Sequence, residues 1–160
     1  MLMIVVATLG AGPLADLEGA WAGSLQYRDY QSDALVALPM RTENRLHGDI
    51  LIQQTFFTDP GREVLRAGTI AVDLEAGKAY ETYAASNAAE ASVSDVTFEP
   101  TKSGWRVTTL RRGEDDNAPA MIRMVMELDG DRFTAEKTVD PEGDGRDVFL
   151  FRNRVVLERE

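Results

Sequence analysis

The residues able to support acid–base, nucleophilic or metal chemistry are few in this chain. His47 is the only histidine, and acid–base catalysis by histidine needs a positioned partner that no neighbouring motif supplies. We therefore expect His47 to be a solvent-exposed turn residue. There is no cysteine, and no serine lies in a Gly-x-Ser-x-Gly elbow. The sequence predicts no catalytic residue, no metal site and no cofactor.

The loop from Asp140 to Gly145 is the nearest approach to a metal-binding motif. Its acidic residues alternate before a glycine, as they do in a calcium loop. A twelve-residue calcium loop ends on a glutamate, but that position here is Phe151. The flanking residues also alternate as strands do. We expect a solvated hairpin loop.

Ligand binding in a cavity is the chemistry that the sequence supports better. Three runs of alternating apolar residues could line a cavity. Gln54 and Asn153 are the amide side chains in these runs, and a buried amide needs hydrogen-bonding partners. Met124 and Met126 suit an adaptable wall, since methionine fills irregular space. The same residues would suit a solid core, so both interpretations stay open. The candidate ligand-binding residues are Tyr27, Gln54, Phe56, Met124, Met126, Phe151 and Asn153.

Tyr27 belongs to the densest polar and aromatic cluster of the chain, Tyr27-Arg28-Asp29-Tyr30. Tyrosine offers an apolar ring with a hydroxyl group, so this cluster could rim the mouth of a cavity. Alternatively, Arg28 and Asp29 only pair with their neighbours at a strand end.

Strands must position these residues, because the dominant period of the chain is two rather than three and a half. Turn sequences such as Thr58-Asp59-Pro60-Gly61 and Asp129-Gly130 separate the runs. Consecutive strands joined by short turns favour a meander, and closing it removes its exposed edges. We predict an all-β fold, an antiparallel up-and-down β-barrel of roughly 8–10 strands in a single domain over residues 16–160. The expected runs are 21–30, 34–38, 49–57, 62–74, 78–84, 92–99, 105–111, 120–128, 131–139 and 146–159.

The two ends of the barrel region carry a short pair of motifs. Gly19-Ala20-Trp21 opens the first run, and the last run carries Arg152 and Arg154. In these motifs the chain resembles the calycin superfamily, the lipocalins and fatty-acid-binding proteins, and it looks like uncharacterised bacterial secreted proteins of lipocalin-like type.

This resemblance implies that Trp21 packs across the barrel floor beneath an arginine of the last strand, here Arg152 or Arg154. The planar cation would stack on the indole and close that end, with Gly19 beside it. Both arginines alternate with Phe151 and Asn153, so neither reaches Trp21 without a bulge if those two residues line the interior. The resemblance also implies a small, mostly apolar molecule bound inside the barrel.

Length and charge exclude several classes of function. A chain of 160 residues is expected to form one domain. Its net charge of −10 disfavours nucleic acids and anionic membrane surfaces, which attract clustered lysine and arginine. The longest apolar stretch, Leu2 to Gly12, is too short to span a bilayer. The oligomeric state is left open.

The first fifteen residues contain no charged side chain, and Leu2 to Gly12 has about the length of a signal-peptide core. We expect a signal peptide over residues 1–15 that is cleaved before Asp16, and therefore a periplasmic or secreted protein. The alternative is an ordinary N-terminal strand in a cytoplasmic protein.

The leading hypothesis is non-covalent binding of a small lipophilic molecule inside the β-barrel. The alternative is a filled barrel that acts as a structural or protein-interaction domain, for which we would expect an exposed apolar patch. An enzyme on a barrel scaffold ranks last. It would require an Asp, Glu or His with a strongly perturbed pKa beside the apolar wall.

Overall fold

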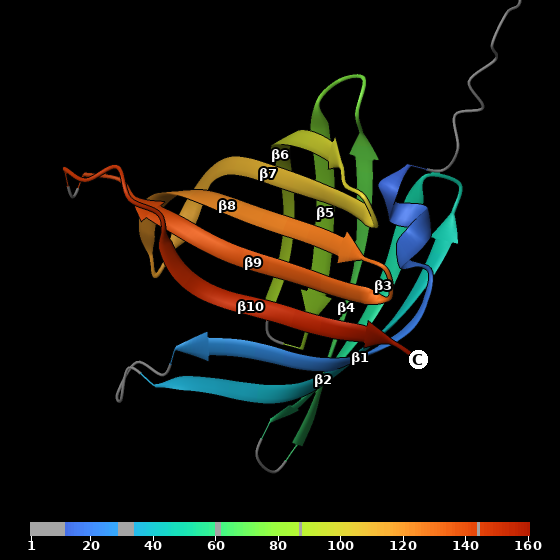
Figure 1. The fold of residues 1–160 in the computed structure, drawn as a ribbon. Coiled ribbons are helices and arrows are strands. Elements are labelled where there is room, and N and C mark those ends of the chain that lie inside the picture. Colours follow the sequence, from blue (N-terminus) through green and yellow to red (C-terminus); the bar gives the residue numbers. More distant parts are fainter. Residues whose placement is uncertain (1–11, 29–33, 60–61, 87, 144) are drawn as a thin grey trace, which may run out of the picture.

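Ten antiparallel strands form a closed up-and-down barrel in the computed structural model of the chain (Figure 1). The structure describes residues 12–28, 34–59, 62–86, 88–143 and 145–160. Each strand pairs with its neighbour along the chain, and β10 pairs with β1 to close the barrel. The predicted all-β meander is confirmed. A short 3₁₀-helix, η1 (Pro13–Leu17), precedes β1 (Gly19–Arg28), β2 (Leu35–His47), β3 (Ile50–Asp59), β4 (Arg62–Asp73), β5 (Lys78–Ala85), β6 (Ala88–Pro100), β7 (Gly104–Asp115), β8 (Ala118–Asp129), β9 (Arg132–Pro141) and β10 (Leu150–Arg159).

Tight turns explain where strand boundaries differ from the prediction. Residues 112–119 fall between the predicted runs 105–111 and 120–128, but most of them continue β7 and β8 as far as the pair Asp115–Ala118. The turn consists of Asp116 and Asn117, with φ of 54° and 59°. Two consecutive residues with positive φ match the twist of a hairpin, and Asp and Asn are the non-glycine residues that adopt this region most readily.

One end of the barrel interior, which we call the floor, is filled by aromatic and aliphatic side chains. Trp21 is 1% exposed, and Trp105 and Phe133 are almost as fully buried. Phe133 meets both indoles edge to face, with ring centroids 6.3 and 6.4 Å apart. Leu51, Val107, Met126, Leu128 and Leu157 belong to the same buried cluster. This end therefore supplies most of the apolar core.

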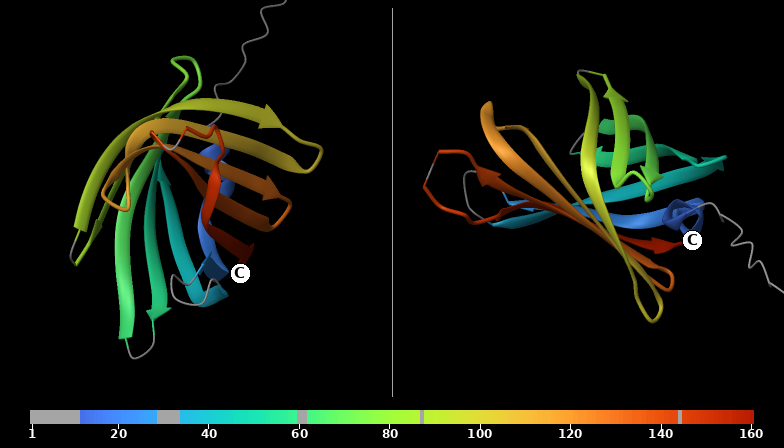
Figure 2. Two further views of the ribbon diagram at one scale, coloured as in Figure 1. Left: turned by 90° about the vertical axis from the view of Figure 1, so that its left-hand side faces the viewer. Right: turned by 90° about the horizontal axis from the view of Figure 1, so that it is seen from above.

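The helix η1 lies at the same end of the barrel as the C-terminus (Figures 1 and 2). Leu14 and Leu17 are buried there. The Leu17 carbonyl accepts hydrogen bonds of 2.9 Å from Trp21 Nε1 and from Asn44 Nδ2. Trp105 Nε1 donates to the Asp16 carboxylate over 3.1 Å. Both buried indole N–H groups are thus satisfied by this helix.

The expected cleavage point between Ala15 and Asp16 falls inside η1. Cleavage there would remove Pro13 and Leu14, which are buried at the floor. Residues 1–11 of the expected signal peptide lie outside the described residues. Within the described part of the chain, no helix has the length and apolar character needed to cross a membrane.

An arginine of the last strand does stack on Trp21, but the residue is Arg159. Its guanidinium carbon lies 4.3 Å from the centre of the Trp21 ring, and the two residues are direct partners in the β1–β10 register. Arg159 also donates to the carbonyls of Asp16 and Glu18, over 2.7 and 2.9 Å. The prediction of Arg152 or Arg154 at this position was therefore wrong.

Their actual places follow from the register. Arg152 lies at an irregularity between Phe151 and Asn153, where β10 shifts against β9. Arg154 pairs with Glu136 on the outer surface. Gly19 does lie beside the stacked pair: its φ is 114°, and a β-carbon there would be 3.8 Å from Arg159 Nη1.

Candidate functional site

The opposite end of the interior, which we call the mouth, differs from the floor in exposure. On β1 to β4 six of its inward residues are apolar or aromatic, yet only half-buried, and the inward Arg66 of β4 is exposed. An inward side chain of a closed barrel can be exposed only to space inside the barrel or at its rim. The mouth is therefore not filled as the floor is. These residues form an apolar wall: Leu25, Tyr27, Val36, Leu38, Phe57 and Val64.

The facing part of the mouth is charged. The inward side chains of β5 to β7 include Glu81, Tyr83, Glu90 and Arg111, as the strand registers require. Arg111 Nη2 forms an ion pair with Glu90 Oε1 at 2.6 Å, and both side chains are partly shielded from solvent. Burial and the hydrogen bond to Glu90 raise the pKa of Tyr83.

Glu81 is the most perturbed carboxyl group of this cluster. Burial raises its pKa above the ordinary value, and the negative charge of Glu90 raises it further. The guanidinium of Arg111 offsets part of this effect. The shift has a clear cause, because desolvation disfavours the charged form of a carboxyl group.

Arg66 of β4 lies where the apolar and charged walls meet. Its guanidinium carbon is 4.6 Å from the centre of the Tyr83 ring and 5.7 Å from that of Phe57. Among the described residues, no carboxylate forms an ion pair with it. The two rings hold the cation without using its N–H groups, which remain able to donate to a bound molecule.

A second charged group joins β7, β9 and β10 on the inner side. Asp115 accepts hydrogen bonds from Lys137 Nζ at 2.9 Å and from Arg152 Nε at 2.6 Å. Burial alone would raise the pKa of Asp115, but the hydrogen bonds from Lys137 and Arg152 outweigh it and lower the pKa. The irregularity in β10 is what brings Arg152 to this group.

Among the described side chains of the mouth, cationic groups outnumber carboxylates, although the whole chain carries a net charge of −10. Among side chains that the structure describes, four cationic groups face three carboxylates there. They are Arg66, Arg111, Lys137 and Arg152, with Glu81, Glu90 and Asp115. Burial of Glu81 favours its neutral form, which adds to this imbalance.

Four of the seven candidate ligand-binding residues lie on the inner face. Tyr27 and Asn153 are register partners in the mouth, and both are half-buried. Met124 lies between mouth and floor, whereas Met126 belongs to the filled core.

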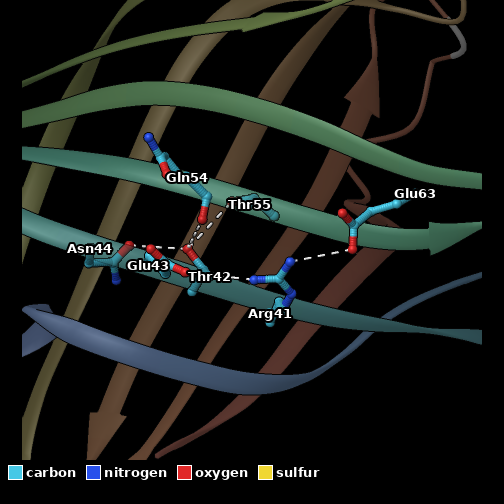
Figure 3. Close-up of polar contacts among 7 residues, drawn as sticks. All are labelled: Arg41, Thr42, Glu43, Asn44, Gln54, Thr55 and Glu63. Atoms are coloured by element: carbon cyan, nitrogen blue, oxygen red, sulfur yellow. Dashed lines mark hydrogen bonds and ion pairs between the residues drawn. The ribbon is translucent and has the colours of Figure 1, made fainter.

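Three of the seven candidates lie on the outer face instead. Gln54 is exposed, and its backbone carbonyl accepts a hydrogen bond of 3.0 Å from the hydroxyl of Thr42 (Figure 3). Phe56 lies beneath the Arg41 guanidinium, whose carbon is 3.8 Å from the ring centre. Phe151 pairs with Thr138 of β9. Thr138 faces outward because its neighbour Val139 faces inward, so Phe151 faces outward as well.

The phase of β3 was therefore predicted wrongly. Its inward residues are Leu51, Gln53, Thr55 and Phe57, opposite the buried Thr42 and Asn44 of β2. Both faces of this strand carry apolar side chains, so alternation alone could not choose between them. Figure 3 shows Arg41 bridging to Glu63 on the same outer side, at 3.4 Å.

The charged residues of the mouth were not identified from the sequence. Arg66, Glu90 and Arg111 are separated by more than twenty residues and meet only through the registers of four strands. One signal was available, since Arg66 and Glu81 fall in phase with apolar residues of their own strands. His47 lies where it was expected, exposed at the end of β2.

Comparisons with known proteins support the barrel fold of the chain. No family model and no curated protein matches the chain. The crystal structure of Rv2717c from M. tuberculosis is similar, with a TM-score of 0.64 over 93% of this chain and 98% of that chain. The sequences are 16% identical, so the similarity concerns the barrel alone.

Proposed function

We propose that the barrel binds a small amphipathic molecule non-covalently in its mouth. The apolar part of the ligand would lie against the wall of β1 to β4, and an acidic group would pair with Arg66. The observation that carries this proposal is the state of Arg66, a cation stacked on two aromatic rings with no ion-paired carboxylate among the described residues.

The other cations of the mouth are already engaged. Arg111 is paired with Glu90, and Lys137 and Arg152 share Asp115. An incoming anion would have to compete with these carboxylates, whereas no carboxylate among the described side chains is ion-paired with Arg66. Burial of apolar ligand surface at roughly 25 cal/mol per Å² would supply the remaining driving force.

Two fluorescent probes that differ only in charge test this proposal. 1-Anilinonaphthalene-8-sulfonate and N-phenyl-1-naphthylamine share one ring system, and only the first carries a sulfonate. We expect the wild-type protein to bind the sulfonate more tightly, and we expect Arg66→Gln to abolish that preference while leaving binding of the neutral probe in place.

Arg41→Gln is the matched control, because Arg41 stacks on Phe56 in the same manner on the outer face. It should leave the preference unchanged. Equal losses in the two variants, or a preference that survives Arg66→Gln, would contradict the proposal. Denaturing extraction of the purified protein followed by mass spectrometry would then identify any acidic amphiphile that co-purifies.

Acid–base catalysis is the second candidate, and Glu81 is the observation that favours it. A carboxyl group whose pKa is raised by burial holds its proton to higher pH than an exposed one, which suits it to act as a general acid. If the barrel is an enzyme, Glu81→Gln should abolish turnover of a bound molecule while leaving its binding largely intact.

We further propose that the chain is a lipocalin-like member of the calycin superfamily. The stacking of Arg159 on Trp21 at the point where the last strand meets the first supports this assignment.

A further inference from the structure

The outer surface of β3 to β6 carries a contiguous area without any charged side chain, which we call the uncharged face. The registers place three outward rows side by side across these four strands. Its four largest apolar side chains, Ile50, Ile52, Tyr80 and Val93, are between 39% and 55% exposed. The rows are Ile50, Ala71, Tyr80 and Val93; Ile52, Thr69, Thr82 and Ala91; and Gln54, Ala67, Ala84 and Ala89.

The rest of the outer surface is built differently. Cross-strand ion pairs join Arg106 to Glu127, Arg132 to Glu158 and Arg154 to Glu136 over β7 to β10. Charged residues make up 28% of the chain, so twelve uncharged positions in one area are a local feature. Because exposed apolar area is costly in water, an area of this kind indicates a contact surface.

Two shallow hollows adjoin each other along the uncharged face. The first, of about 560 Å³, is lined mostly by small residues of β4 to β6 and also by Ile52, Tyr83 and Glu90. The second, of about 370 Å³, is lined by Ile50, Tyr80 and Val93 together with smaller residues and Glu81. The strands approach closely at this point: a β-carbon on Gly68 would lie 2.4 Å from the Thr82 carbonyl oxygen.

We propose that the uncharged face binds the same face of a second copy of this chain. In a two-fold dimer the same patch meets itself, so it must not repel itself. A patch without charge meets this condition even though each chain carries a net charge of −10. A charged partner would find no counter-charge within these rows.

The size of the face sets the strength of the dimer. With strands about 4.8 Å apart and rows about 7 Å apart, twelve positions cover roughly 400 Å² per copy. A stable complex buries about 800 Å² on each partner. We therefore expect a weak, concentration-dependent dimer. The rows of the uncharged face point away from the barrel interior, whereas Glu81, Tyr83 and Glu90 of the mouth reach the two hollows from the inner side.

Sedimentation velocity of the full chain over a concentration range of about 1 μM to 1 mM tests this proposal. We expect a shift from monomer to dimer within this range. Salt should strengthen the dimer, because it screens the repulsion between two acidic chains while leaving the apolar contact in place. A monomer at all concentrations would overturn the proposal. A dimer that salt weakens would overturn it as well.

Ala91→Arg and Ala37→Arg form a matched pair of variants. Both alanines are exposed and face outward, on β6 within the uncharged face and on β2 away from it. Ala91→Arg should weaken dimerisation at least about ten-fold, since it places like charges against each other at the two-fold contact. Ala37→Arg should leave it unchanged. If Ala91→Arg does not fold, Val93→Lys serves instead, and dimerisation that survives a folded variant overturns the proposal.

Discussion

The floor and the mouth are lined by the same ten strands, yet they have opposite character. At the floor, Trp21 and Trp105 are buried, and both indole N–H groups are satisfied by η1. At the mouth, the inward side chains are partly exposed, and charged groups lie beside apolar ones. The comparison teaches that stability is concentrated at one end. The other end can therefore carry Glu81 and Arg66, which a filled core would not accommodate.

The largest expected effect is at the floor. Trp21→Ala should reduce the free energy of unfolding by about 3–5 kcal/mol, because it leaves a cavity in the core and removes the surface on which Arg159 stacks. Urea denaturation measures the loss. Tyr27→Ala, on the same strand but half-buried in the mouth, should cost clearly less. Equal losses of unfolding free energy in the two variants would contradict the contrast between a filled floor and an open mouth.

Asp115→Asn should have the next largest effect, about 2 kcal/mol at neutral pH, because Lys137 and Arg152 would lose a charged acceptor. The lowered pKa of Asp115 means that its contribution is present above the pKa of the unfolded chain and is lost as pH falls through the folded value. The variant should therefore match the wild type in strongly acidic solution. Asp131→Asn, at an exposed partner of Arg159, is the control and should change stability less.

Glu81→Gln should have a smaller effect of opposite sign. The raised pKa of Glu81 means that the folded state loses stability as pH rises through the folded value, because a buried carboxylate is then formed. The variant should be modestly more stable than the wild type at neutral pH and equal to it below the pKa of the unfolded chain. Glu127→Gln, in an outer ion pair, should not be stabilising. A loss of stability in Glu81→Gln at neutral pH would mean that the mouth depends on this charge.

The smallest effect is expected on the outer surface. Arg154→Ala removes an ion pair with Glu136 in which the arginine side chain is 48% exposed. Such pairs contribute about 0–1 kcal/mol, and the contribution is screened by salt. Thermal unfolding with and without added salt measures it. A loss as large as that of Asp115→Asn would show that inner and outer ion pairs contribute equally.

Much of the fold could be predicted because the signals are local. Asp129-Gly130 turns the chain as expected, with Gly130 at a φ of 59°. The arginine that stacks on Trp21 could not be predicted from the short motifs, since the pairing of β1 with β10 selects Arg159. Phe151 was placed on the wrong face because an irregularity in β10 interrupts the alternation.

The all-β class, the meander and the presence of an apolar core follow from the amino-acid sequence. Alternation and turn residues act between neighbours along the chain, so these features need no knowledge of the partner strand. The inward face of β3, and the lack of an ion pair at Arg66 among the described residues, depend instead on how the strands assemble. Whether Arg66 meets a carboxylate depends on strands that are distant in sequence, and their register is set by packing of the whole barrel.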